Sequence, residues 1–245
     1  MSTFEILLEQ TGLFIIYMLA GVILIRTKVL NRETLEPISR FVIKMALPLM
    51  VFINITDGAG KEVLLQSWPV LVIAAGFYIC MFISGKILTK IFHLEENQTG
   101  VYRAMMLFGN IGFMGMPMIV SVFPGDGALY ASVFMMIDQF ILWTLGVKFL
   151  ASDGKKKFQL RKLVNPATVA IVLAVFMVLT GLRLPALLDT AFQKIGATSS
   201  PLAMIYVGGI FATADISKYL KKISLYGIVI VKMILMPGLL FVVLG

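Results

Sequence analysis

Apolar and charged residues alternate along this chain in long blocks. Eight predominantly apolar stretches, each close to the ~20 residues that a helix needs to cross a hydrocarbon core, are separated by short segments that hold most of the charges. Because lipid offers no hydrogen-bond partners, the backbone inside it must be helical. The pattern predicts eight membrane-spanning helices, over residues 6–25, 38–56, 68–88, 103–123, 128–150, 164–180, 197–214 and 223–244.

The composition supports a membrane protein rather than a soluble one. Of the 245 residues, 59% are hydrophobic and only 14% are charged, against roughly 25% charged residues in a typical soluble domain. The mean hydropathy is +0.96. We therefore expect an all-α integral membrane protein whose main surrounding is the lipid bilayer.

The basic residues give the predicted orientation. The net charge is +8, but most Lys and Arg residues lie in the first, third, fifth and seventh loops, and the other loops hold only Lys61, Arg183 and Lys194. Positive loops face the cytoplasm, so we expect a multi-pass protein of the cytoplasmic membrane with its N-terminus outside. This distribution argues against nucleic acid as a partner.

The chain contains a weak internal repeat. A shift of about 153 residues places Leu13 on Pro166 and Pro48 on Pro201. The first copy has five spans, so the second copy is expected to insert upside down, as in many transporters. We predict a first five-helix repeat at 1–151, a cytoplasmic loop at 152–163 and the first three helices of an inverted second repeat at 164–245.

Two further helices are expected beyond the eight, because the second copy is shorter than the first. On this interpretation the chain is a truncated form of a ten-helix protein. A genuine eight-helix protein is the alternative.

The fourth apolar stretch carries the strongest candidate for a site. It contains Gly109, Asn110, Gly112, Gly115 and Pro117 within nine residues. Proline removes a backbone donor, and glycine permits close approach of backbones. Together they favour an unwound segment at mid-membrane, where carbonyls, amides and the Asn110 side chain face a ligand. The alternative is a kinked helix with a tight packing face.

Four segments in this order resemble the auxin efflux carrier family, which includes plant PIN-type carriers and bacterial permeases. They are Ala46-Leu47-Pro48-Leu49, the stretch from Asn110 to Pro117, Asn165-Pro166, and Ser199-Ser200-Pro201-Leu202. Each segment is a weak signal alone, and their order and spacing make the resemblance specific.

The resemblance implies ten helices in two inverted five-helix repeats, with a scaffold domain and a mobile transport domain. The fourth helix of each repeat would be broken, and the two broken helices would cross at their prolines. Pro117 matches the first crossover proline and Asn110 the polar residue before it; the second crossover helix is not in this chain. The candidate substrate-binding residues are Asn110, Gly112, Gly115, Pro117, Pro48 and Pro201. Related carriers often dimerise through the scaffold, so a homodimer is a candidate assembly.

Three ionisable residues inside the spans are candidates for ion coupling or charge compensation. Asp138 is a candidate site for a coupling proton or sodium ion, or else makes a structural hydrogen bond. Lys44 lies near the cytoplasmic end of its span, where it either extends toward water or compensates charge. Lys232 lies deeper, and either offsets an anionic substrate or pairs with Asp138.

These features favour a secondary transporter of small organic anions, and the resemblance suggests dicarboxylates such as malate or malonate. The sequence shows no metal-ligand cluster, nucleophile triad or nucleotide-binding loop, so we expect no enzyme activity, no metal and no cofactor. The alternatives are a carrier similar to bile-acid/sodium symporters or sodium/proton antiporters, an integral membrane enzyme, and a non-transporting fragment.

Overall fold

The computed structural model describes residues 2–58, 61–124, 127–146, 149, 165–215 and 217–244, and all regular structure in these residues is helical. Seven of the described helices are long and apolar enough to cross a membrane, and the 15-residue Pro166–Thr180 is a shorter apolar helix. Each of the eight predicted spans therefore coincides with a helix. The all-α membrane fold expected from the sequence is confirmed.

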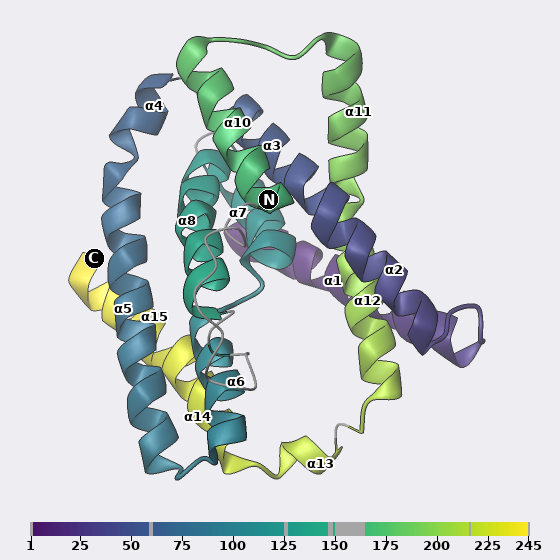
Figure 1. Cartoon of the computed structure of the whole chain (residues 1–245), viewed down its shortest axis with the longest axis vertical. Coiled ribbons are helices and arrows are strands. Elements are labelled where there is room, and N and C mark those ends of the chain that lie inside the picture. Colours follow the sequence, from purple (N-terminus) through teal and green to yellow (C-terminus); the bar gives the residue numbers. More distant parts are fainter. Residues whose placement is uncertain are drawn as a thin grey trace.

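The helices form two groups that lie side by side (Figure 1). The first group consists of α1 (Thr3–Arg26), α2 (Arg32–Phe41) with α3 (Leu47–Gly58), α10 (Pro166–Thr180), and α11 (Ala186–Ala197) with α12 (Ser199–Thr213). The second consists of α5 (Trp68–Ile91), α6 (Glu96–Leu107) with α7 (Met116–Val122), α8 (Gly127–Ile141), and α14 (Ile223–Ile230) with α15 (Met236–Leu244). The short helices α4 (Lys61–Gln66) and α13 (Ser217–Leu220) connect them.

Several span boundaries predicted from the sequence were wrong. The second span begins at Arg32, six residues early, and the fourth helix begins at Glu96. The seventh begins at Ala186, so Lys194 lies in α11 and not in a loop. Polar residues at these helix ends hid the helical pattern, because their side chains lie at or beyond the edge of the apolar region. The predicted loop at 152–163 lies outside the described residues.

In the first group, helices of one predicted repeat pack on helices of the other. The most extensive helix contacts pair α1 with α12 and α10 with α3. Helix α1 thus packs on a segment of the second predicted repeat, and α10 packs on a segment of the first. The division into two inverted repeats stays a prediction. Packing of α1 on α12 and of α10 on α3 is the arrangement expected if two repeats pack against each other.

Helices α1 and α12 approach each other at backbone distance. A Cβ atom at Gly208 would lie 2.7 Å from the carbonyl carbon of Met18, and one at Gly21 would lie 2.9 Å from that of Ile205. Small residues let membrane helices pack this closely and gain dispersion contacts that lipid tails cannot match. Glycine is therefore required at these two positions.

Three membrane helices contain a π-helical turn directly before a proline. In each case the residue before the proline donates its N–H five positions back, to the first residue of the turn. Proline lacks an N–H and its ring crowds the preceding turn, and the wider turn relieves that crowding by moving carbonyls apart. The three turns are η1 (Val42–Ala46) before Pro48, η2 (Ile111–Gly115) before Pro117 and η5 (Val231–Leu235) before Pro237.

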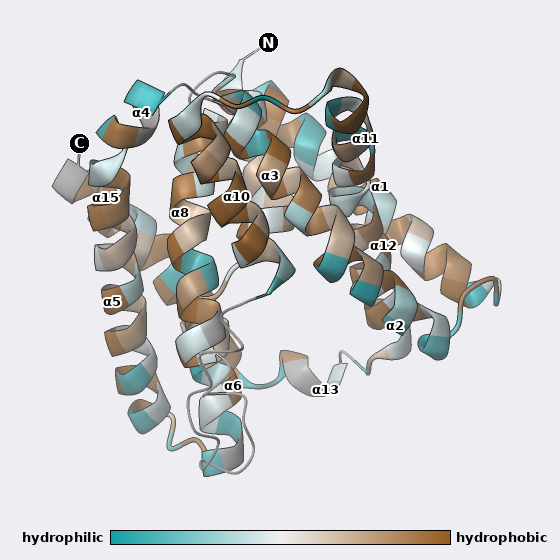
Figure 2. Cartoon of the chain, turned by 45° about the horizontal axis from the view of Figure 1, so that its top comes forward, coloured by the Kyte–Doolittle hydropathy of each residue, from teal (hydrophilic) through white to brown (hydrophobic). Residues whose placement is uncertain are grey.

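The two ends of the helix bundle differ in their loops (Figure 2). The N-terminus, α4 and the α10–α11 turn lie at one end, and the α1–α2 loop, the α5–α6 loop and α13 lie at the other. The second end carries the basic residues Arg26, Lys28, Lys90, Lys221 and Lys222. Between the ends, large apolar side chains such as those of Ile16, Ile79 and Val172 are more than half exposed, as lipid-facing residues are.

Candidate functional site

The fourth span is broken. Helix α6 ends at Leu107, Phe108 adopts an extended conformation, and the helix resumes after Asn110 in the π-helical turn η2 and then in α7. The backbone carbonyl of Asn110 accepts hydrogen bonds from the N–H groups of Met114 at 3.1 Å and Gly115 at 3.0 Å. The Asn110 side chain is exposed and, among the described residues, forms no hydrogen bond. The unwound segment expected from the glycines and the proline is therefore present at residues 108–110.

The two glycines after the break have different surroundings. A Cβ atom at Gly112 would lie 3.0 Å from the Met135 methyl carbon and 3.2 Å from a Leu47 methyl carbon. The corresponding Cβ position at Gly115 has no atom closer than 3.7 Å. Gly112 thus lets α3 and α8 pack against η2, and Gly115 has room for a side chain.

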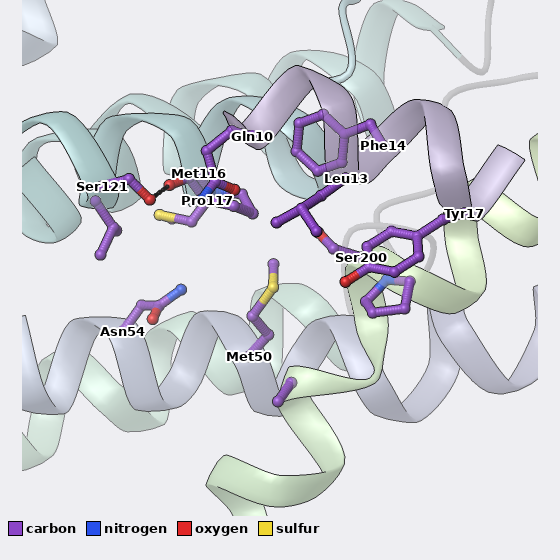
Figure 3. A pocket seen from close by; sticks show the side chains of 13 residues that line it. Gln10, Leu13, Phe14, Tyr17, Met50, Asn54, Met116, Pro117, Ser121 and Ser200 are labelled. Atoms are coloured by element: carbon purple, nitrogen blue, oxygen red, sulfur yellow. Dashed lines mark hydrogen bonds between the residues drawn. The ribbon is translucent and has the colours of Figure 1, made fainter. Parts of the chain in front are cut away.

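A cavity of about 360 Å³ lies beside the broken helix, between α1, α3, α7 and α12. Figure 3 shows Met50 and Asn54 extending from α3 toward Pro117 of α7, with Gln10 of α1 on the opposite side. The other lining residues are Leu13, Phe14, Tyr17, Met116, Val120, Ser121, Ala197, Ser200 and Pro201. The wall is mixed apolar and polar, without a charged side chain among these residues, and its size suits a small ligand.

Ser200 joins the first helix group to the broken helix. Its hydroxyl donates a short hydrogen bond to the backbone carbonyl of Phe113. In a regular α-helix this carbonyl would accept from the residue four positions on, which is Pro117 and has no N–H. The Ser200 hydroxyl of α12 thus replaces the backbone N–H donor that Pro117 lacks, and the Phe113 carbonyl keeps a hydrogen bond.

Replacing Ser200 by alanine is expected to lower the free energy of unfolding by about 1–2 kcal/mol, because the Phe113 carbonyl loses this donor. The adjacent Ser199→Ala is the matched control. The Ser199 hydroxyl is fully buried and has no hydrogen-bond partner among the described residues, so its removal should be neutral or stabilising. Thermal unfolding in detergent measures both variants. Equal losses of stability in the two would contradict the role of Ser200.

A second polar cluster lies within the other helix group. The Tyr78 hydroxyl donates a short hydrogen bond to one carboxylate oxygen of Asp138, and the Gln139 amide lies 3.5 Å from the other. All three side chains are buried. The Asp138 carboxylate also attracts the Lys232 ammonium. Sequence reasoning found Asp138 but missed Tyr78, whose position within an aromatic, apolar span gave no sign of a buried partner.

The lysines predicted for charge compensation differ in their surroundings. Lys44 is exposed on η1. Lys232 is half-buried on η5 and donates hydrogen bonds to the backbone carbonyls of Met105 at 3.0 Å and Phe108 at 2.7 Å. Within the described residues it forms no direct ion pair with Asp138.

The predicted substrate-binding residues do not all meet at one place. Pro117 and Pro201 line the cavity, whereas Pro48 is buried and does not line it, and Asn110 lies at the break itself. Sequence reasoning missed the lining residues Gln10, Asn54 and Ser121. Each of these is a polar residue within or at the end of an apolar helix, which is the signal that would have found them. The assignment of all these residues to substrate binding stays a prediction.

A polytopic bundle in which a broken, proline-bearing helix lines a cavity between helices has the architecture of a membrane transport protein. A sequence comparison agrees: the family described as membrane transport protein matches residues 10–159 and 154–244. The chain therefore belongs to this family, which is the auxin efflux carrier family of the resemblance.

Individual relatives support the same class. The chain is 26% identical over 240 residues to the uncharacterized transporter YfdV of Escherichia coli (strain K12), an alignment that covers 94% of this chain and 75% of YfdV. It is 24% identical over 191 residues to the uncharacterized transporter MJ1031 of Methanocaldococcus jannaschii, covering 74% of this chain and 61% of MJ1031. This chain is a multi-pass membrane transporter.

Proposed function

We propose that this transporter is a secondary active carrier of small organic anions, with dicarboxylates such as malate and malonate as the first substrates to test. The observation that carries the proposal is the broken fourth span, which is unwound at residues 108–110 and whose continuation α7 lines the cavity with Pro117. A half-helix that begins inside a membrane directs its partial positive charge and free N–H groups toward the break, where they favour an anion.

The size and lining of the cavity support a small polar substrate. A volume of about 360 Å³ is at the lower end of the range for ligand pockets. The side chains of Gln10, Asn54 and Ser121 offer hydrogen-bond donors and acceptors without a fixed charge. Such groups suit carboxylates and hydroxyl groups of a compact metabolite better than a large apolar molecule.

The position of the cavity supports movement of one helix group against the other. Its walls come from α1, α3 and α12 of the first group and from α7, which continues the broken helix of the second. A substrate bound there would touch both groups. We propose that the first group is the scaffold and the second the transport domain, and that a gradient of protons or sodium ions, or the membrane potential, drives the cycle.

We also propose that the protein resides in the cytoplasmic membrane with its N-terminus outside. The support is the concentration of basic residues at the end of the bundle opposite the N-terminus.

The test is uptake of labelled malate and malonate into proteoliposomes under an imposed pH or sodium gradient. Asn110→Ala, Pro117→Ala and Gln10→Ala are expected to reduce the initial rate roughly tenfold or more, because each removes a group or a bend at the site. Thr11→Ala is the matched control, since Thr11 is an exposed neighbour of Gln10 on α1 and should leave the rate unchanged.

Two outcomes would contradict the proposal. Uptake by the wild-type chain no faster than by empty liposomes would contradict carriage of these anions by this chain, through a wrong substrate class or because the chain is a non-transporting fragment. Wild-type rates in Pro117→Ala and Gln10→Ala would show that the cavity beside α7 is not the transport site.

A further inference from the structure

The end of α6 is capped by a side chain from a distant helix. The Lys232 ammonium donates hydrogen bonds to the carbonyls of Met105 and Phe108, at 3.0 and 2.7 Å. Lys232 is 124 residues beyond Phe108 in the sequence and lies on the π-helical turn η5 of the last described span.

These carbonyls need a donor because the helix is broken. In an uninterrupted helix they would accept from the N–H groups of Gly109 and Gly112, but the extended conformation of Phe108 ends α6 at Leu107. The last carbonyls of any helix lack internal partners, and no water is present in the hydrocarbon region to replace them. One ammonium group has three donors and here supplies two of these carbonyls.

The ammonium also changes the sign of the charge at the break. The C-terminal end of a helix carries about half an elementary negative charge, so the bare end of α6 would repel an anion. Lys232 places a full positive charge on that end. The Cβ position of Gly109 lies 4.0 Å from the Lys232 nitrogen, so the break and the ammonium are adjacent.

A buried carboxylate lies near enough to Lys232 to attract its ammonium, although the described residues show no direct ion pair between the two side chains. This Asp138 carboxylate accepts a hydrogen bond from the Tyr78 hydroxyl and is approached by the Gln139 amide. Tyr78 lies on α5 and Asp138 on α8, so a negative charge held between these two helices favours the positive charge of Lys232 at the end of α6.

We propose that Lys232 is a positioning residue of the substrate site: its ammonium caps the broken end of α6, keeps residues 108–110 unwound and makes the break receptive to anions. The proposal rests on the anion-carrier function proposed above. In this role Lys232 binds backbone carbonyls of the protein and does not contact the substrate directly.

The test compares Lys232→Met with Lys90→Met by hydrogen–deuterium exchange of the amides of residues 104–114 and by malonate binding to the purified chain. Lys90→Met is the matched control, because Lys90 lies in the same helix group, at the end of α5, and is exposed. Lys232→Met is expected to raise exchange in this segment at least about threefold, through loss of two hydrogen bonds, and to weaken malonate binding roughly tenfold, through loss of the positive charge. Lys90→Met should change neither.

The outcomes separate the possible roles. Unchanged exchange in Lys232→Met overturns the cap, and weaker malonate binding in that case would mean that Lys232 contacts the substrate directly. Increased exchange together with wild-type malonate affinity would overturn the effect on anion recognition. If the wild-type chain binds no malonate, the proposed substrate class fails, but the exchange comparison still decides whether Lys232 caps α6.

Discussion

Alanine in place of Gly21 is expected to lower the stability of this protein strongly, by about 1–3 kcal/mol or more. A Cβ atom there would lie 2.9 Å from the carbonyl carbon of Ile205 and 3.0 Å from the amide nitrogen of Gly209. Both atoms belong to the backbone of α12, so no side-chain rotation relieves the clash, and α1 must move away. The measurement is thermal unfolding of the purified chain in detergent, with an expected fall in Tm of roughly 5 °C or more.

Gly12→Ala is the matched control for this prediction. Gly12 lies on the same helix α1, and no atom lies within 4 Å of its Cβ position. The substitution there should leave stability unchanged or raise it slightly, because alanine favours the helix. If both glycine variants unfold at the wild-type temperature, close packing of α1 on α12 does not contribute to stability as the structure indicates.

The second large effect is expected at the buried carboxylate of Asp138. Asp138→Ala removes the acceptor of the Tyr78 hydroxyl and the negative charge opposite Lys232. An unsatisfied buried polar group costs about 1–3 kcal/mol, and the Tyr78 hydroxyl loses its acceptor here. The Lys232 ammonium loses a nearby opposite charge but keeps its hydrogen bonds to Met105 and Phe108. We therefore expect a loss of stability of about 1–3 kcal/mol, measured by the same thermal unfolding.

A double-mutant cycle shows whether the hydroxyl and the carboxylate act as one unit. Tyr78→Phe should cost about 1–2 kcal/mol alone and almost nothing in the Asp138→Ala background, because the bond is already absent. Tyr226→Phe is the control, since this hydroxyl donates to the Leu220 carbonyl at 2.8 Å from an exposed ring. Fully additive losses for Tyr78 and Asp138 would mean that their contact contributes nothing.

The helices themselves were predictable because the relevant energy is local. Each apolar stretch gains transfer free energy residue by residue, and its backbone can satisfy its hydrogen bonds only within the helix. The break after Leu107 was predictable for a similar reason, since Gly109 and Pro117 act on their own turns of backbone. Helix boundaries at Arg32, Glu96 and Ala186 were missed because polar helix ends look like loops.

The partners of these helices were decided by the tertiary structure. All the spans present similar apolar surfaces, so association depends on small differences in shape and on single polar groups. The sequence pattern indicated the glycines of the fourth span, whereas the most extensive helix contact, between α1 and α12, uses Gly21 and Gly208.

In the candidate site, too, local sequence determined some features and tertiary packing determined the others. Local sequence indicated an unwound segment within the stretch from Gly109 to Pro117 and a polar residue, Asp138, at membrane depth. Local sequence did not indicate that the Ser200 hydroxyl would donate to the Phe113 carbonyl, or that Tyr78 would bind Asp138. Nor did it indicate that Lys232 would cap α6. These contacts join residues 60 to 124 positions apart, and each exists only because packing fixes the rotation and depth of two helices relative to each other.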